Sequence, residues 1–476
     1  GANPIRQPLS NLQEAGTLYG AIIYDKAPVM MRQLERLMGE TPFRDGLRKY
    51  LHKYSYSNAT WPDLISILDA RTPANLQSWN KVWVNTPGRP VISYEMEKAN
   101  GRILKFIVSQ KGERQQNYIL PQFFEIALIY PDHVEEETIN LNTSRVDVLK
   151  LRGKKVPSFI LLNSSGQGYG LFALDPNMLS RLEEMKDKVM RASAYVSMYE
   201  NMLDGKYITP KALLNVYRDL LTKEPEELNL SLITGHITDI YWRLLLPSVR
   251  KQISVSLEND LWNALKNETA TGKKKILFRA YQSVALSGES LNTLYNIWKN
   301  QSPPDGVKLS EDEYTALALS LAVKDYPDST ILNTQLARLT NPDRKNRLLF
   351  LMPALSPDQH IRDAFFNSLE DQQVRKKESW VADALGYLHH PLRTTSSRKY
   401  LKKSLDMLQQ IQLTGDIFFP GSWLSSTFGN YQSPEAVAIV REFLNSHPNY
   451  NPKLKAKILQ SADPLFRAEK LVYGGR

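Results

Sequence analysis

From about Asn177 to its end, the chain carries a helical pattern for about three hundred residues, which constrains the fold more than any other feature. Apolar residues recur there at steps of three and four, the spacing of one helix face. Short helices joined by short turns favour antiparallel pairs, so we predict an α-solenoid over residues 178–476. No strict repeat is visible, and an irregular helical bundle is the alternative. Four of these helices are predicted to begin at a capping residue followed by proline: Thr209-Pro210, Asn341-Pro342, Ser356-Pro357 and Ser433-Pro434.

The pattern changes at residues 85–90, Asn-Thr-Pro-Gly-Arg-Pro, because two prolines and a glycine cannot continue a helix. Beyond this break, short runs rich in β-branched and aromatic residues are separated by turn residues, as in strands of an antiparallel sheet. We therefore predict a small β-sandwich over residues 89–177. Its strands are expected at Val91–Met96, Ile103–Val108, Phe123–Tyr130 and Phe159–Leu162.

The residues before the break, 1–88, predict helices with clear boundaries. Gly39 follows a helical run of apolar residues at the position where glycine commonly ends a helix. Thr60, with an acidic residue three positions later, matches the capping box that starts a helix. Four helices are predicted, starting near Met30, Thr41, Thr60 and Leu76. The fold class is therefore multidomain and mainly α, with one small β domain.

Composition excludes several functions. The 476 residues contain no cysteine, so disulfides, thiolate metal sites and a cysteine nucleophile are excluded. The net charge of +10 comes from basic residues spread among acidic ones, and no nucleic-acid partner is expected. No apolar run approaches the ~20 residues of a membrane span. The opening Gly-Ala-Asn-Pro lacks an initiator Met and any signal-peptide pattern. We expect that a preceding segment with any targeting signal has been removed, and the compartment is not predicted.

No complete catalytic set is found in the sequence. None of the seven histidines lies in H-E-x-x-H, the helical motif that places two imidazoles on one face of a zinc ion. His389 and His390 are adjacent, so their rings point in different directions on a helix. They are predicted to be exposed or to lie near a site without binding metal. No metal or cofactor ligand is predicted within this chain.

Several motifs occur in the order found in the aminopeptidase N family of zinc metallopeptidases. The segment Ile22–Leu34 resembles the one in which that family carries a tyrosine at the start of a long helix, and it lies downstream of Asn3-Pro4-Ile5. It differs from the family at Ala27, where a glycine is usual. Further similarities follow in order: the Phe-Arg-x-Gly-Leu helix at Phe43–Leu51, the Tyr-x-Asn-Ala turn at Tyr56–Leu64, the Gly-x-Pro-Val strand start at Gly88–Ile92, and Asn163, Gly168–Phe172 and Asp175 at the end of the family's β-sandwich.

The resemblance implies a fold and a catalytic role. Residues 1–88 would be the helical tail of a thermolysin-like (gluzincin) catalytic domain, followed by the β-sandwich and the helical domain. The parent would be a zinc aminopeptidase acting on peptides, and Tyr24 would donate a hydrogen bond to the oxyanion formed at the first peptide bond. The zinc ligands and the motif that binds the substrate amine would belong to missing domains of the same chain. On that basis we predict no activity for this fragment alone.

Other interpretations stay open at this stage. By pattern alone, Tyr24 is a packing residue, because it follows Ile22 and Ile23 at the head of a helix. The chain could also be a non-catalytic helical-repeat module that binds peptides or proteins, since the concave face of a solenoid suits that task. A third possibility is a relative that has lost its zinc site.

Overall fold

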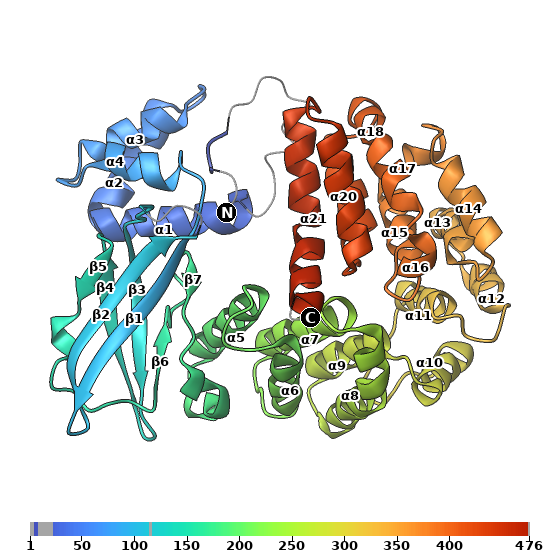
Figure 1. Cartoon of the computed structure of the whole chain (residues 1–476), viewed down its shortest axis with the longest axis horizontal. Helices are drawn as coiled ribbons and strands as arrows, with labels where there is room; N and C mark the ends of the chain where they lie inside the picture. Colours follow the sequence, from blue (N-terminus) through green and yellow to red (C-terminus); the bar gives the residue numbers. More distant parts are fainter. Residues whose placement is uncertain (1–3, 8–21, 114–116, 475–476) are drawn as a thin grey trace. The chain divides into compact units, whose positions relative to one another are not determined.

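A computed structural model describes residues 4–7, 22–113 and 117–474 of the chain (Figure 1). The fold is mainly helical with two small β-sheets, as predicted. It separates into two compact units, Gly1–Met202 and Leu203–Arg476. Among the described residues, the first unit holds four α-helices, both sheets and most of a fifth α-helix, and the second unit contains helices and no strand. The three predicted segments, 1–88, 89–177 and 178–476, remain a prediction about domains.

The first unit opens with a π-helical turn, η2 (Ile22–Lys26), which continues into α1 (Ala27–Met38). Three more helices follow: α2 (Glu40–Lys53), α3 (Trp61–Asp69) and α4 (Leu76–Trp83). Gly39 ends α1 with φ = 86°, a conformation that favours glycine, and Thr60 forms the predicted capping box. The predicted N-cap of α2 at Thr41 is wrong by two residues, because Gly39 is its N-cap and the helix begins at Glu40. The core of these helices contains Met30, Leu34, Leu68, Trp79 and Trp83.

The strands form what we call the two-sheet region, residues 90–172. One sheet has the order β5-β2-β1-β7 and the other β4-β3-β6. All neighbours are antiparallel except β1 and β7. Apolar side chains of both sheets share one core, including Ile92, Phe106, Phe124 and Leu162. The strands are β1 (Pro90–Ala99), β2 (Arg102–Gly112), β3 (Gln122–Ile129), β4 (Val134–Leu141), β5 (Arg145–Asp147), β6 (Phe159–Leu162) and β7 (Leu171–Phe172).

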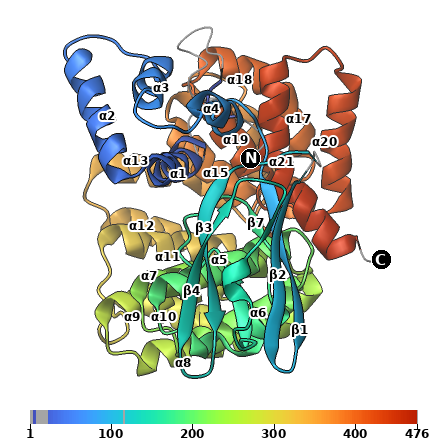
Figure 2. The ribbon, with the colours of Figure 1, turned by 90° about the vertical axis from the view of Figure 1, so that its left-hand side faces the viewer.

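Helix α1 lies at one end of these strands, where it contacts β3 (Figure 2). After β7, two short 3₁₀ turns (Pro176–Ser180 and Leu182–Glu184) lead to α5 (Lys188–Leu203). The side chain of Asn201 on α5 donates to the carbonyl of Phe172 at 2.7 Å. Helix α5 is therefore tied to the two-sheet region.

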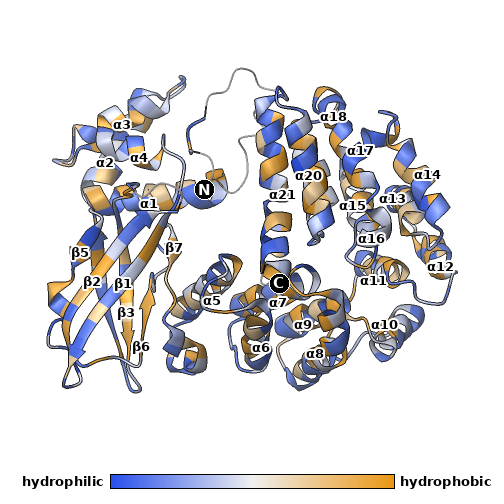
Figure 3. Ribbon diagram, in the orientation of Figure 1, coloured by the Kyte–Doolittle hydropathy of each residue, from blue (hydrophilic) through white to orange (hydrophobic). Residues whose placement is uncertain are grey.

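The second unit is a succession of helices that mostly contact their near neighbours in sequence, and Figure 1 shows them following one another in a curved row. Apolar and polar residues alternate around them (Figure 3), with the apolar faces forming a large core that includes Leu351, Leu385 and Trp423. The helices are α6 (Pro210–Leu220), α7 (Glu227–Arg243), α8 (Pro247–Asn267), α9 (Thr271–Val284), α10 (Gly288–Asn300), α11 (Glu311–Val323), α12 (Ile331–Arg338), α13 (Pro342–Leu355), α14 (Gln359–Ser368), α15 (Glu378–Leu388), α16 (Thr394–Ser397), α17 (Tyr400–Asp406), α18 (Leu408–Thr414), α19 (Phe419–Phe428), α20 (Pro434–Ser446) and α21 (Pro452–Tyr473).

Three of the four predicted helix starts are confirmed, since Thr209, Asn341 and Ser433 cap α6, α13 and α20 with their side chains. The fourth is wrong, because Asp358 and not Ser356 caps α14. Within the described residues, no helix combines the length and apolar character that crossing a bilayer requires.

Candidate functional site

Tyr24 lies in the π-helical turn η2, directly before α1, and its residue is 67% exposed. Pro28, in the first turn of α1, has no N–H with which to bond the carbonyl of Tyr24 four residues earlier. A wider π turn is consistent with that missing bond, and such turns are frequent at functional sites. Within the described residues Tyr24 is therefore not part of a packed core. Asn3, part of the upstream motif, falls outside the described residues.

Lys26 ends the same turn and points the opposite way, into the protein, where it is only 3% exposed. Its Nζ lies 5.1 Å from the centre of the Tyr169 ring, a cation–π contact. Among the described residues it has no hydrogen-bond partner. Burial therefore lowers the pKa of Lys26 to about 8. One turn of chain thus presents an accessible tyrosine on one side and a buried cation on the other.

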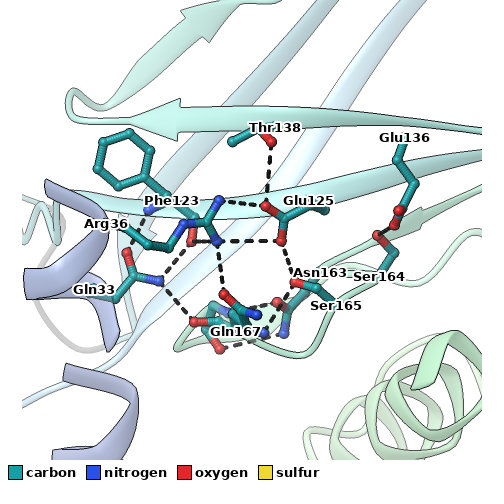
Figure 4. A network of polar contacts seen from close by, with 11 residues as sticks. Gln33, Arg36, Phe123, Glu125, Glu136, Thr138, Asn163, Ser164, Ser165 and Gln167 are labelled. Atoms are coloured by element: carbon teal, nitrogen blue, oxygen red, sulfur yellow. Dashed lines mark hydrogen bonds and ion pairs between the residues drawn. The ribbon is translucent and has the colours of Figure 1, made fainter. Parts of the chain in front are cut away.

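Gln33, on α1, is 1% exposed. Its side-chain amide forms hydrogen bonds with the backbone of β3 in the way that the peptide group of a neighbouring strand does. Its side-chain oxygen accepts the N–H of Phe123 at 2.7 Å, and its Nε2 donates to the carbonyl of Phe123 at 2.7 Å. The same Nε2 donates to the carbonyl of Gln167 at 2.8 Å (Figure 4). At Phe123 the strand has no ladder partner on this side, because its pairing with β6 begins at Ile126. The glutamine amide fills that position.

Arg36, one turn further along α1, forms an ion pair with Glu125 of β3 (Figure 4). It also donates to the side-chain oxygen of Gln167 at 3.2 Å. Glu125 in turn accepts hydrogen bonds from Ser165 and Thr138. Burial opposes ionisation of Glu125, but the bonds from Arg36, Ser165 and Thr138 outweigh it and hold its pKa below the usual range. The pair is therefore ionised at neutral pH and links α1 to the sheet.

The loop between β6 and β7 that receives these contacts is braced from within. Asn163 adopts φ = 60°, and its side-chain oxygen accepts the N–H of Gly168 at 2.7 Å. Gln122 bonds to both backbone groups of Tyr169, at 2.8 and 3.0 Å. Ser164 donates to Glu136 at 2.6 Å. These hydrogen bonds give the Asn163, Gly168 and Tyr169 motif a structural role, because they hold the turn next to α1 in one conformation.

Two other motif residues serve packing. A Cβ added to Gly46 on α2 would lie 2.4 Å from Cδ2 of the buried Leu68 on α3, so a larger residue here would require Leu68 or the helix to shift. Arg89, beside the predicted strand start, forms ion pairs with Glu113 and Glu200 at 3.0 and 2.9 Å. Gly46 thus occupies its motif position for close packing, and Arg89, at the variable position of its motif, ties the start of β1 to Glu113 and Glu200.

Of the two alternatives predicted for His389, exposed or near a site without binding metal, the structure excludes exposure. It is fully buried at the end of α15, where its Nδ1 lies 2.8 Å from the hydroxyl of Tyr431. Burial lowers the pKa values of His389 and His390 to about 3, so both are neutral at pH 7. No group of three or more His, Cys, Asp or Glu in the described residues could hold a metal ion. The part of the chain that the structure describes therefore does not form a zinc site by itself.

A cavity of about 670 Å³ lies within the second unit, bounded by helices that include α7, α9 and α11. Its acidic residues are paired with basic ones: Asp239 with Arg243, and Glu313 with Arg279. Lys324 donates to two backbone carbonyls, at 2.8 and 3.2 Å, and burial lowers its pKa to about 7. These charged side chains lining the cavity thus already have partners within the protein.

Sequence inspection missed Lys26, Gln33 and Arg36 as parts of this arrangement. The helical pattern could have indicated two of them, because Lys26 and Gln33 lie on the same helix face as the buried Met30 and Leu34. A polar residue within an apolar stripe needs a specific partner. For Gln33, that partner lies ninety residues away in sequence and could not be identified from the pattern.

Comparisons with known proteins agree with the geometry. Residues 159–465 match the ERAP1-like C-terminal domain, and residues 1–83 match the peptidase family M1 domain. Aminopeptidase N of Streptomyces lividans is 25% identical over 227 residues, which cover 44% of this chain and 26% of that protein. Aminopeptidase N of Lactococcus lactis subsp. cremoris is 25% identical over 45% of this chain and 24% of that protein. The Tricorn protease-interacting factor F2 of Thermoplasma volcanium is 20% identical over 85% of this chain and 49% of its own length.

Among solved structures, aminopeptidase A of Legionella pneumophila in complex with aspartic acid matches with a TM-score of 0.65 at 13% identity. The match covers 97% of this chain and 59% of that one, and shows a shared fold. The chain spans about a quarter to a half of the three relatives above. These matches do not support the alternative of a helical-repeat binding module. The chain belongs to the aminopeptidase N family of M1 metallopeptidases and corresponds to the C-terminal portion of its members.

Proposed function

We propose that this chain is part of a zinc-dependent aminopeptidase that removes N-terminal residues from peptides, and that Tyr24 is one of its catalytic residues. The observation that carries the proposal is the accessible position of Tyr24 on the π turn before α1, inside the segment that matches the M1 peptidase domain. A tyrosine hydroxyl is a hydrogen-bond donor at neutral pH. It can therefore stabilise the oxyanion that develops when the peptide carbonyl is attacked.

The described residues of this chain supply no zinc ligands, so the metal would be held by a part of the enzyme outside this sequence. A transition-state donor does not supply a nucleophile. We therefore expect no hydrolysis of aminoacyl-anilide substrates by the chain alone, with or without added zinc. Release of product that a chelator abolishes would contradict this part of the proposal.

The finer architecture belongs to the same proposal. Residues 1–88 would complete the thermolysin-like catalytic domain, residues 89–177 would form a β-sandwich, and residues 178–476 an α-solenoid. The shared core of the two sheets and the contacts between successive helices support this division. Peptides are the proposed partners, together with the remaining domains of the enzyme.

The test is Tyr24→Phe in the zinc-loaded enzyme that contains this chain. Loss of one oxyanion donor typically lowers kcat by about 10²–10³, while substrate binding changes little. Tyr207→Phe is the matched control, because Tyr207 is also accessible, at 52%, but lies in the second unit. A kcat for Tyr24→Phe within about threefold of the unmodified enzyme would refute the role of Tyr24.

A further inference from the structure

We propose that Gln33 and Arg36 are positioning residues for Tyr24, which act by fixing the direction of α1 against strand β3 and the loop between β6 and β7. The inference rests on the proposed function of Tyr24 and goes beyond it. It assigns to the two-sheet region a part in catalysis, although no residue of that region is proposed to touch substrate.

A change in the direction of helix α1 would displace Tyr24, because Tyr24 lies at the N-terminal end of the same helical segment. The turn η2 continues directly into α1, so the two move together. Gln33 is nine residues after Tyr24, which at 1.5 Å per residue corresponds to about 14 Å along the helix axis. A tilt of about 5° at Gln33 would therefore move Tyr24 by about 1 Å. A displacement of that size is enough to reduce a catalytic rate severely.

Three residues of this segment make contacts that oppose such a tilt, and all of these contacts lead to the same small part of the two-sheet region. Lys26 contacts Tyr169, Gln33 bonds to Phe123 and to the loop, and Arg36 pairs with β3 and bonds to the loop. The positions 26, 33 and 36 are separated by seven and three residues, so they lie on one face of the helix. The sheet-side loop is itself braced, as Figure 4 shows around Asn163 and Ser165.

The chemistry of these contacts favours orientation over simple packing. An apolar side chain could fill the space of Gln33, whereas its amide satisfies three directional hydrogen bonds at 2.7–2.8 Å. Arg36 adds a planar group that bonds to a carboxylate and an amide oxygen together. Hydrogen bonds from two points on one helix fix both its tilt and its rotation.

The experiment is a double-mutant cycle in the zinc-loaded enzyme, with steady-state kinetics on aminoacyl-anilides. Gln33→Leu is expected to lower kcat about tenfold with KM within about twofold, and Arg36→Lys about threefold. In the Tyr24→Phe background, Gln33→Leu should lower kcat by less than about twofold, because a tyrosine that no longer acts cannot be misplaced further. Arg32→Gln is the matched control, since Arg32 lies on the same helix with its side chain 53% exposed. Its kcat should be unchanged.

The outcomes separate the two proposals. Equal loss of kcat for Gln33→Leu with and without the Tyr24 hydroxyl would overturn the positioning role and leave Tyr24 as a donor. An unchanged rate for Tyr24→Phe would overturn both. If Gln33→Leu does not fold, Arg36→Lys carries the same test, and its thermal unfolding is measured beside its kinetics. An Arg36→Lys enzyme with normal kcat would then count against the proposal.

Discussion

Replacement of the buried Lys26 by methionine is expected to stabilise the first unit. The side chain is 3% exposed and finds no hydrogen-bond partner among the described residues. Burial lowers its pKa from 10.5 to about 8. Each tenfold change in an acid dissociation constant corresponds to about 1.4 kcal/mol, so the charged form costs the native state at most about 3 kcal/mol at pH 7. Methionine has a similar length and contacts aromatic rings favourably. We expect Lys26→Met to raise the free energy of unfolding by about 1–3 kcal/mol.

The pH dependence gives the sign of the effect. Between about pH 8 and 10.5 the unfolded chain keeps the proton on Lys26 and the native state has lost it, so native stability rises with pH in this window. Below pH 8 Lys26 is protonated in both the native and the unfolded state, so the free-energy cost of its buried charge does not change with pH. The advantage of Lys26→Met should therefore be full below pH 8 and should shrink as the pH approaches 10.5.

The assay must report on the first unit alone, because the chain has two units. Urea denaturation at pH 7, 8, 9 and 10 is followed by a brief hydrogen–deuterium pulse and mass spectrometry of peptides from α1 and β3. Lys98→Met, at an exposed position of β1, is the control and should change stability by less than about 0.5 kcal/mol. The reasoning would be refuted if Lys26→Met and the unmodified chain had the same free energy of unfolding at pH 7 and if the two free energies changed in parallel up to pH 10.

Three further predictions concern stability and can be measured by the same unfolding assay. Gly46→Ala should destabilise the first unit by about 0–2 kcal/mol net, because the collision of its Cβ with the buried Leu68 opposes the roughly 1 kcal/mol that alanine gains over glycine within a helix; a stabilisation by that full amount would mean that Leu68 moves aside without cost. Glu258→Leu should destabilise the second unit by about 3 kcal/mol or more, because it leaves two backbone N–H groups and a serine hydroxyl without their acceptor. Burial opposes ionisation of Glu313, but bonds from Ser310, Lys275 and Arg279 lower its pKa to about 2. Its contribution to stability is present above about pH 4.5 and is lost on acidification toward pH 2, so Glu313→Gln should flatten the acid side of the stability curve of the second unit.

Much of the fold could be predicted because local signals agreed with tertiary structure. Phe159–Leu162 is a continuous apolar run, and all four residues are buried in β6. Strand β4 (Val134–Leu141) was not predicted, because three consecutive glutamates hide its alternation and only Ile139 and Leu141 are buried. Strands β5 and β7 have three and two residues, too few to show a period.

The misplaced start of α14 lies between two local capping signals, of which Ser356 instead ends the preceding helix as the C-cap of α13. Ser356 and Asp358 are both good capping residues, two positions apart. In the structure, Arg362 donates to the carbonyls of Ser356 and Pro357, at 2.5 and 2.8 Å, and the helix begins after them. For the candidate site, the ordered motifs singled out Tyr24, but the anchoring of α1 depends on contacts of Gln33 and Arg36 with residues about ninety positions away. No periodicity encodes such contacts.

The side-chain amide of Gln33 also covers backbone groups at the start of strand β3. Strand β3 extends beyond its pairing with β6, so its first residues would otherwise present open peptide groups on that side. Gln33 occupies both groups of Phe123, and the N–H of Ser164 occupies the carbonyl of Glu125 at 2.9 Å. An extended peptide binds readily to an open strand edge. An extended peptide could therefore pair with β3 at Phe123 only by displacing the Gln33 amide.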